Sequence, residues 1–192
     1  MEKPVIPKSR YVPIVQQPWH CIPACMSMIM NKNGMTLKPQ EELGHYMGLV
    51  VPSEDEAKFY NPEVREKPLS WGYGPQYSPD KAFTELGIPI VINKQILASE
   101  LKDVTELLVQ LRKTEQTDGD ALLCFRYGVA YDTDYKYGHG VVFDRVVGDE
   151  IQVVDPIMGG PQWRWVKAEK MFAAIQEHGD KNFGGIWLFK KK

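Results

Sequence analysis

The spacing of apolar residues changes period near the middle of the chain. In the first half, an apolar run over 22–32 is typical of a helix buried on most sides, and apolar residues from Leu101 to Leu111 recur at the spacing of a helix that buries one face. Asn33 and Gly34 would cap the end of the first such segment, and Ser78 and Pro79 would start a later one. We expect helices over 22–32, about 39–47, 78–87 and about 99–113, with a short strand over 88–92.

From residue 121 onward, β-branched and aromatic residues form short runs separated by turns. We expect strands over 121–126, 140–147, 151–154, 162–166 and 185–189, and a helix over 168–178. Gly148 and Asp149 form a two-residue turn, which predicts a hairpin between the strands on either side of it. The fold class is therefore α+β, with an N-terminal helical half packed on a C-terminal antiparallel β-sheet half.

The length favours one domain over residues 1–192, because a chain of 192 residues can bury a single sizeable core. One stretch, 48–78, is rich in Pro, Gly, Tyr and Trp and carries little periodicity. We interpret it as a structured excursion from the domain rather than a linker.

Composition and charge narrow the classes of function. A net charge of −2 provides no positive footprint for nucleic acid or for an anionic membrane. No apolar run approaches the roughly 18 residues of a spanning helix, and the first residues lack the apolar core of a signal peptide. An odd count of three cysteines argues against a disulfide framework. We expect a cytoplasmic protein with free thiols, or a secreted one if a signal peptide has been removed.

The most informative residue is Cys21, which lies where an extended segment turns into the first helix. The positive end of the helix dipole and its unsatisfied N–H groups favour a thiolate there. Gln16 and Gln17 lie just upstream, and either amide could point at a developing oxyanion. A cysteine nucleophile needs this arrangement together with a base.

A candidate base and its orienting group occur in the strand half. His139 precedes one strand of the predicted hairpin, and Asp155 ends the other, at nearly equal distances from the turn. We therefore expect the two side chains to lie side by side at the open end of the hairpin. A carboxylate bonded to one imidazole nitrogen would leave the other nitrogen to face the thiol.

These motifs resemble the papain-like cysteine peptidases of the bacteriocin-processing family, whose members process double-glycine leader peptides and often belong to an export transporter. The resemblance runs from Val12 to Phe189. It rests on a Gln before Cys21-x-Pro23-Ala24, on Gly138-His139 before Val141-Val142, and on Val153-Val154-Asp155-Pro156. It implies a papain-like fold, a peptide or protein substrate and no cofactor, in a stand-alone form without the transporter.

The resemblance also implies a role for each site residue. Cys21 would be the nucleophile, His139 the general base and acid, and Asp155 the group that orients the imidazole. A glutamine would complete the oxyanion hole with the backbone N–H of Cys21. The family usually has Gly after the nucleophile, where this chain has Ile22, and its Gln often lies six residues before the Cys. Gln16, five residues before Cys21, is the closer match, and Gln17 is the alternative.

Other interpretations of the same residues remain open at this point. Cys25 and Cys124 fit a helix interior and a strand core, where cysteine is usually a small apolar residue. A zinc site at Cys21, Cys25 and His139 would lack a second closely spaced ligand pair, so we expect no metal. The chemistry could also belong to an amidase, a deamidase or an acyltransferase. A peptide-binding module with decayed activity is the alternative outside the enzymes.

Overall fold

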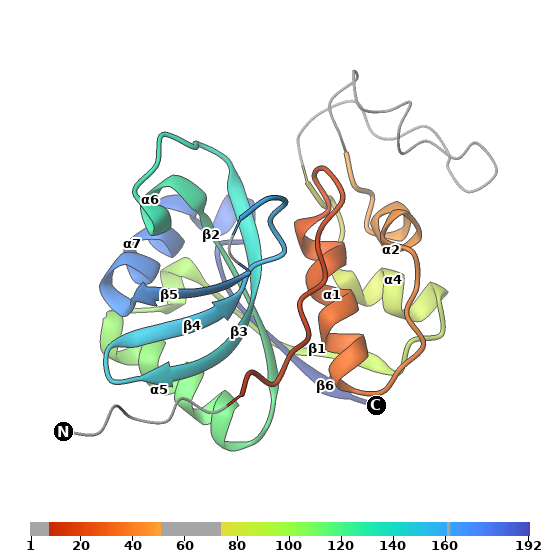
Figure 1. Ribbon diagram of the computed structural model, residues 1–192, viewed down its shortest axis with the longest axis horizontal. Coiled ribbons are helices and arrows are strands. Elements are labelled where there is room, and N and C mark those ends of the chain that lie inside the picture. The colour runs from red at the N-terminus through yellow and green to blue at the C-terminus, as the bar shows by residue number, and fades with distance from the viewer. Residues whose placement is uncertain (1–7, 51–73, 161) are drawn as a thin grey trace.

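A six-stranded antiparallel sheet forms the centre of the protein, as seen in the computed structural model in Figure 1, which describes residues 8–50, 74–160 and 162–192. The spatial order is β1-β6-β2-β3-β4-β5. The strands are β1 (Ile90–Leu97), β2 (Asp120–Arg126), β3 (Gly138–Val147), β4 (Glu150–Val154), β5 (Trp163–Lys167) and β6 (Gly185–Lys191).

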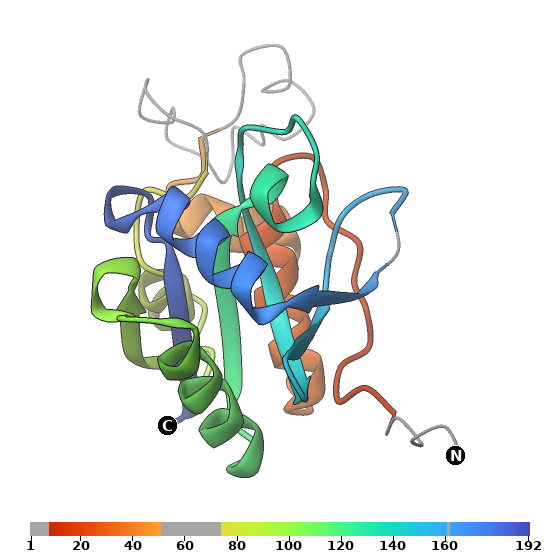
Figure 2. The ribbon, with the colours of Figure 1, turned by 90° about the vertical axis from the view of Figure 1, so that its left-hand side faces the viewer.

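Helices cover both faces of this sheet (Figures 1 and 2). On one face lie α1 (Cys21–Lys32), α2 (Gln40–Tyr46) and α4 (Pro79–Glu85), and on the other lie α5 (Val104–Gln116), α6 (Tyr127–Tyr131) and α7 (Ala168–His178). Each face has its own hydrophobic core, because alternate residues of a strand point to opposite faces. In the described ranges, no helix is long and apolar enough to cross a bilayer.

The first helix is almost entirely enclosed. Nine consecutive residues, from Ile22 to Met30, are buried, as expected for an apolar run placed between a sheet and two other helices. The helix ends as its sequence predicts, because Gly34 takes a left-handed conformation with φ of +67°. The N–H of Met35 then donates to the carbonyl of Met30 at 3.0 Å. The predicted helix over 22–32 is confirmed.

Two predicted elements have other bounds in the structure, and the position of a third within the sheet has no signal in the sequence. The segment expected as a helix over 99–113 first forms a short 3₁₀ turn (Ala98–Glu100), and α5 starts only after Asp103, whose carboxylate caps the N–H of Glu106. Strand β1 extends five residues beyond the predicted end at Ile92. Strand β6 lies between β1 and β2 inside the sheet, because the sheet also recruits β1 from the helical half.

The predicted excursion over 48–78 lies mostly outside the described residues. Its described ends are held together, because the N–H of Val50 donates to the carbonyl of Gly74 at 3.3 Å and the reverse bond measures 3.2 Å. The hairpin predicted at Gly148 and Asp149 is present, with Val147 paired to Glu150.

A β-bulge at Asp144 sets the register of this hairpin. Near the turn Arg145 pairs with Gln152, whereas beyond the irregularity Phe143 pairs with Val153. A one-residue shift of this kind exchanges the faces of all residues beyond it. With the bulge, the register carries Asp155 opposite Val141, on the same face as His139. Without it, Asp155 would lie opposite Val142, whose side chain belongs to the other core.

The bulge is held by buried charges. The carboxylate of Asp144 is fully buried and accepts from the backbone N–H of Arg10 at 3.1 Å. The guanidinium of Arg10 donates two hydrogen bonds to the backbone carbonyl of Asp144, at 2.6 and 3.0 Å. A buried carboxylate requires such partners, so the N-terminal segment fixes the irregularity from outside the sheet.

Helix α1 approaches β3 closely at Gly140. The thiol of Cys25 lies 3.4 Å from the carbonyl of Gly140. A Cβ atom added to Gly140 would lie 2.2 Å from Cδ1 of Ile22. The small residue in the strand therefore accommodates the bulky residue that follows Cys21.

We expect Gly140→Ala to lower the free energy of unfolding by about 1 to 3 kcal/mol, because the new methyl group overlaps Ile22 in a packed core. Ile22→Val removes Cδ1 and should cost about 0.5 to 1.5 kcal/mol alone. The double variant should be clearly more stable than the sum of the two effects predicts, which urea unfolding of all four proteins would measure. Equal stability of Gly140→Ala and the parent protein would contradict this packing.

Candidate active site

Cys21 is the first residue of α1 and lies partly exposed at the floor of a cleft. The chain enters this helix through a tight turn in which the N–H of His20 donates to the carbonyl of Gln17 at 2.9 Å. Trp19 within that turn has a φ of +67°, a conformation that costs free energy for a bulky residue. The thiol therefore lies at the positive end of the helix dipole.

His139 and Asp155 come together as predicted. The imidazole Nε2 lies 2.7 Å from Oδ1 of Asp155, and both side chains are buried. Oδ1 also accepts the backbone N–H of Ile157 at 3.0 Å. The other oxygen of the carboxylate lies 3.1 Å from Nε of Arg164. These three partners hold the carboxylate in place.

The imidazole bridges the thiol and the carboxylate. Burial alone would lower the pKa of His139, but hydrogen bonds to Asp155 and to Cys21 raise it to about 9. Because Nε2 is bonded to Asp155, Nδ1 is the nitrogen available to the thiol. Burial would raise the pKa of Asp155, but the hydrogen bond and charge of His139, the N–H of Ile157 and the charge of Arg164 together outweigh it, so that the pKa lies below its usual value. The arrangement favours the protonated, positively charged imidazole of His139, which lies between the sulfur of Cys21 and a carboxylate oxygen of Asp155.

The two glutamines upstream of Cys21 have different surroundings. The side-chain N–H of Gln17 donates to Glu41 at 2.6 Å, which holds this amide on α2. Gln16 lines the cleft together with Cys21, and its Oε1 has no hydrogen-bond partner in the described part of the chain. Its backbone N–H donates to the carbonyl of Pro156 at 2.7 Å. Of the two glutamines, only Gln16 lines the cleft that contains the thiol.

The cleft has a volume of about 930 Å³ and runs between the helical half and the sheet half. Trp19, two residues before Cys21, packs edge-on against Tyr137, two residues before His139, with ring centroids 5.7 Å apart. This contact joins the two walls. Its volume lies within the usual range of ligand-binding clefts, and Cys21 and His139 both line it.

The other two cysteines are bystanders. Cys25 and Cys124 are buried, and burial raises the pKa of each thiol well above its ordinary value. Such thiols are poor nucleophiles. Within the described residues no group of three or more His, Cys, Asp or Glu side chains is arranged to hold a metal ion.

Arg164 is a site residue that the sequence analysis missed. Besides its ion pair with Asp155, its guanidinium lies 4.3 Å from the centre of the Tyr131 ring and donates to the hydroxyl of Tyr127 at 3.3 Å. The ring of Tyr127 packs edge-on against His139. The alternation of residues in β5 predicts a strand but carries no signal for this contact, which depends on the pairing of β4 with β5.

The raised pKa of His139 predicts how its contribution to stability depends on pH. The contribution is fully present below 6.5, the ordinary value, and is lost as pH rises through about 9. We expect His139→Gln to lower the free energy of unfolding by about 3 kcal/mol more at about pH 6 than at about pH 10. Urea unfolding of both proteins at the two values measures this difference. A difference independent of pH would contradict the imidazolium described above. Both pH values lie above the lowered pKa of Asp155, so this carboxylate stays ionised in both experiments.

Comparison with known proteins supports the fold. No family model and no curated protein sequence matches the chain. Among solved structures it is similar to a crystal structure from Bacillus anthracis, described as that of a "putative C39-like peptidase". The TM-score is 0.56 with 17% sequence identity, and the match covers 94% of this chain and 95% of the other. The chain therefore has the α+β, papain-like fold of a C39-like peptidase.

Proposed function

We propose that this protein is a cysteine peptidase that hydrolyses peptide bonds through Cys21, His139 and Asp155. The observation that carries the proposal is the imidazole of His139, hydrogen-bonded to a buried carboxylate on one side and to a thiol at a helix N-terminus on the other. Nucleophile, base and orienting group in this relation are what acyl transfer through sulfur requires. The shared fold is a second support.

The first half of the reaction forms a thioester. His139 holds the proton of Cys21, and the thiolate attacks the carbonyl carbon of the scissile bond. The negative oxygen that develops is stabilised by the backbone N–H of Cys21 and by the side-chain N–H of Gln16. His139 then donates its proton to the leaving amine as the carbon–nitrogen bond breaks, which leaves the acyl group on Cys21.

The second half releases the acid. With the amine gone, neutral His139 takes a proton from water, and the hydroxide oxygen attacks the thioester carbon. The same two N–H groups stabilise the second oxyanion, and the carbon–sulfur bond breaks to return the thiolate. Asp155 keeps the imidazole oriented throughout and stabilises its charged form, aided by Arg164.

The proposed peptidase acts in a compartment where thiols stay reduced. All three cysteines are free, and the mechanism needs Cys21 as a thiol. The sequence resemblance implies a preference for a double-glycine site, which the library experiment below would detect.

We expect the parent protein to cleave members of a peptide library, and Cys21→Ala and His139→Ala to show no turnover above background. The matched control is Cys25→Ala, which removes a thiol one turn further along α1 and should retain activity. Mass spectrometry of the products would identify the cleaved bonds.

Iodoacetamide should also modify Cys21 faster than a free thiol at neutral pH, and this advantage should vanish in His139→Ala. Alkylation no faster than that of a free thiol would contradict the proposed catalytic role.

The two glutamines provide a sharper test of the oxyanion site. We expect Gln16→Ala to lower kcat by about 10² to 10³, because a donor to the transition state is lost. Gln17→Ala should change kcat less than about tenfold, since its amide is bonded to Glu41. Steady-state kinetics on one library-derived peptide would separate them. The opposite order would assign the oxyanion to Gln17.

A further inference from the structure

The charged side chains that line the cleft are all of one sign. Of the described residues along it, Arg126, Lys136 and Lys181 are cationic, and none is Asp or Glu. The chain as a whole is slightly acidic, with 25 carboxylate residues against 23 basic ones. The cleft therefore departs from the charge balance of the rest of the protein, which is what attracts an anionic ligand.

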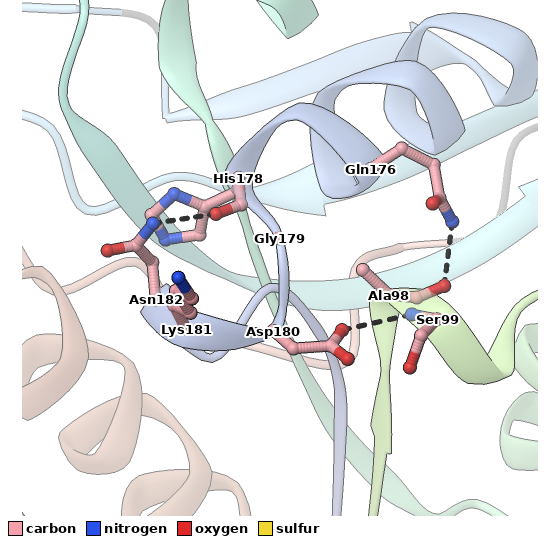
Figure 3. A pocket seen from close by; sticks show the side chains of 8 residues that line it. All are labelled: Ala98, Ser99, Gln176, His178, Gly179, Asp180, Lys181 and Asn182. Atoms are coloured by element: carbon pink, nitrogen blue, oxygen red, sulfur yellow. Dashed lines mark hydrogen bonds between the residues drawn. The ribbon is translucent and has the colours of Figure 1, made fainter.

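These three cations lie on the same side of the cleft as the proposed base. Arg126 ends β2 and pairs in the sheet with Gly138, the residue before His139. Its guanidinium donates to the backbone carbonyl of Lys136, so it bridges the strand and the loop that enters β3. Lys181 lies in the turn that follows α7, beside His178 (Figure 3).

His178 lies beside these cations and packs over Gly138. Its ring covers Gly138 so closely that an added Cβ would lie 2.2 Å from Cε1 of the ring. Burial, followed by the charge of Arg126, lowers the pKa of His178 to about 4. The His178 ring is therefore neutral near pH 7, and the positive charge on this side of the cleft comes from Arg126, Lys136 and Lys181.

Three acidic residues lie near these cations in the sequence, and none of them lines the cleft. Asp180 accepts the backbone N–H of Ser99 at 3.0 Å, on the side of the turn shown in Figure 3. Asp132 pairs with Lys170, and Asp134 is exposed and does not line the cleft. Within the described residues, none of the three cleft cations has a carboxylate partner. Their charge is available to a ligand.

We propose that the cleft selects peptides that carry an acidic side chain close to the scissile bond, and that Arg126, Lys136 and Lys181 bind that carboxylate. This inference rests on the proposed peptidase function and specifies its substrate class. Arg126 is the half-buried member of the three, and a guanidinium can bind a carboxylate through two hydrogen bonds. The two lysines are exposed and contribute longer-range attraction.

The first test uses two alkylating agents of similar size and different charge. Iodoacetate is an anion and iodoacetamide is neutral, so the ratio of their rate constants at Cys21 reports the local potential. We expect this ratio, normalised to N-acetylcysteine, to be about tenfold higher in the protein at low salt and to fall as salt is added. Mass spectrometry would confirm that Cys21 is the modified residue.

Matched variants separate the effect of the three cleft cations on the alkylation rates from the effect of the His139 imidazolium. The triple variant Arg126→Gln, Lys136→Gln, Lys181→Gln should lower the iodoacetate rate at least about threefold and leave the iodoacetamide rate nearly unchanged. Lys102→Gln, an exposed lysine outside the cleft, is the control and should change neither. An unchanged ratio in the triple variant, or a ratio equal to that of the free thiol, would overturn the inference.

The second test uses pairs of peptides that carry Glu or Gln at each position around a cleaved bond. We expect kcat/KM to be about tenfold higher for Glu at one or two positions, and this preference to disappear in the triple variant. Turnover without such a preference would overturn the inference and leave the peptidase function standing. Absence of turnover for every peptide would contradict the peptidase function itself, together with the peptide class assigned here.

Discussion

The close approach of α1 to β3 is the constraint on which the rest of the site depends. The helix carries Cys21 at its first residue, and the strand carries His139 at its second. The two elements touch at Gly140, where only a residue without a side chain leaves room for Ile22. Both elements are packed in dense cores and cannot move independently. Ile22 follows Cys21, and Gly140 follows His139. The packing of Ile22 against Gly140 therefore sets the distance between the thiol and the imidazole.

The second constraint is the register of the hairpin that carries His139 and Asp155. The bulge at Asp144 brings the two side chains onto the same face, and Arg10 holds that bulge from the N-terminal segment. Asp155 then meets Arg164 from β5, which compensates for the cost of burying a carboxylate. The backbone bond from Gln16 to Pro156 links the proposed oxyanion donor to the same corner. Asp155, His139 and Gln16 are thus positioned by one connected piece of structure.

Much of this could be predicted because the relevant signals are local. An unbroken apolar run identified α1, a period near 3.6 identified most of α5, and β-branched and aromatic runs between turns identified β2 to β5, since each pattern reflects burial in a core. Cys21 was recognisable from its place at a helix start, and His139 and Asp155 from their equal distances to a turn. The start of α5 was placed wrongly because Leu101 continues the apolar spacing, although it is buried in the link before Asp103 caps the helix.

By itself, the sequence determined which residues form the helices and strands, and which thiol, imidazole and carboxylate could act together. Only the tertiary structure favours Gln16 over Gln17 as the proposed oxyanion donor, because the preference depends on a contact of Gln17 with Glu41 on another helix. It also decided the central place of β6, the ion pair of Arg164 and the single sign of charge among the described residues of the cleft. Each of these joins segments far apart in the chain, and local periodicity carries no information about such pairings.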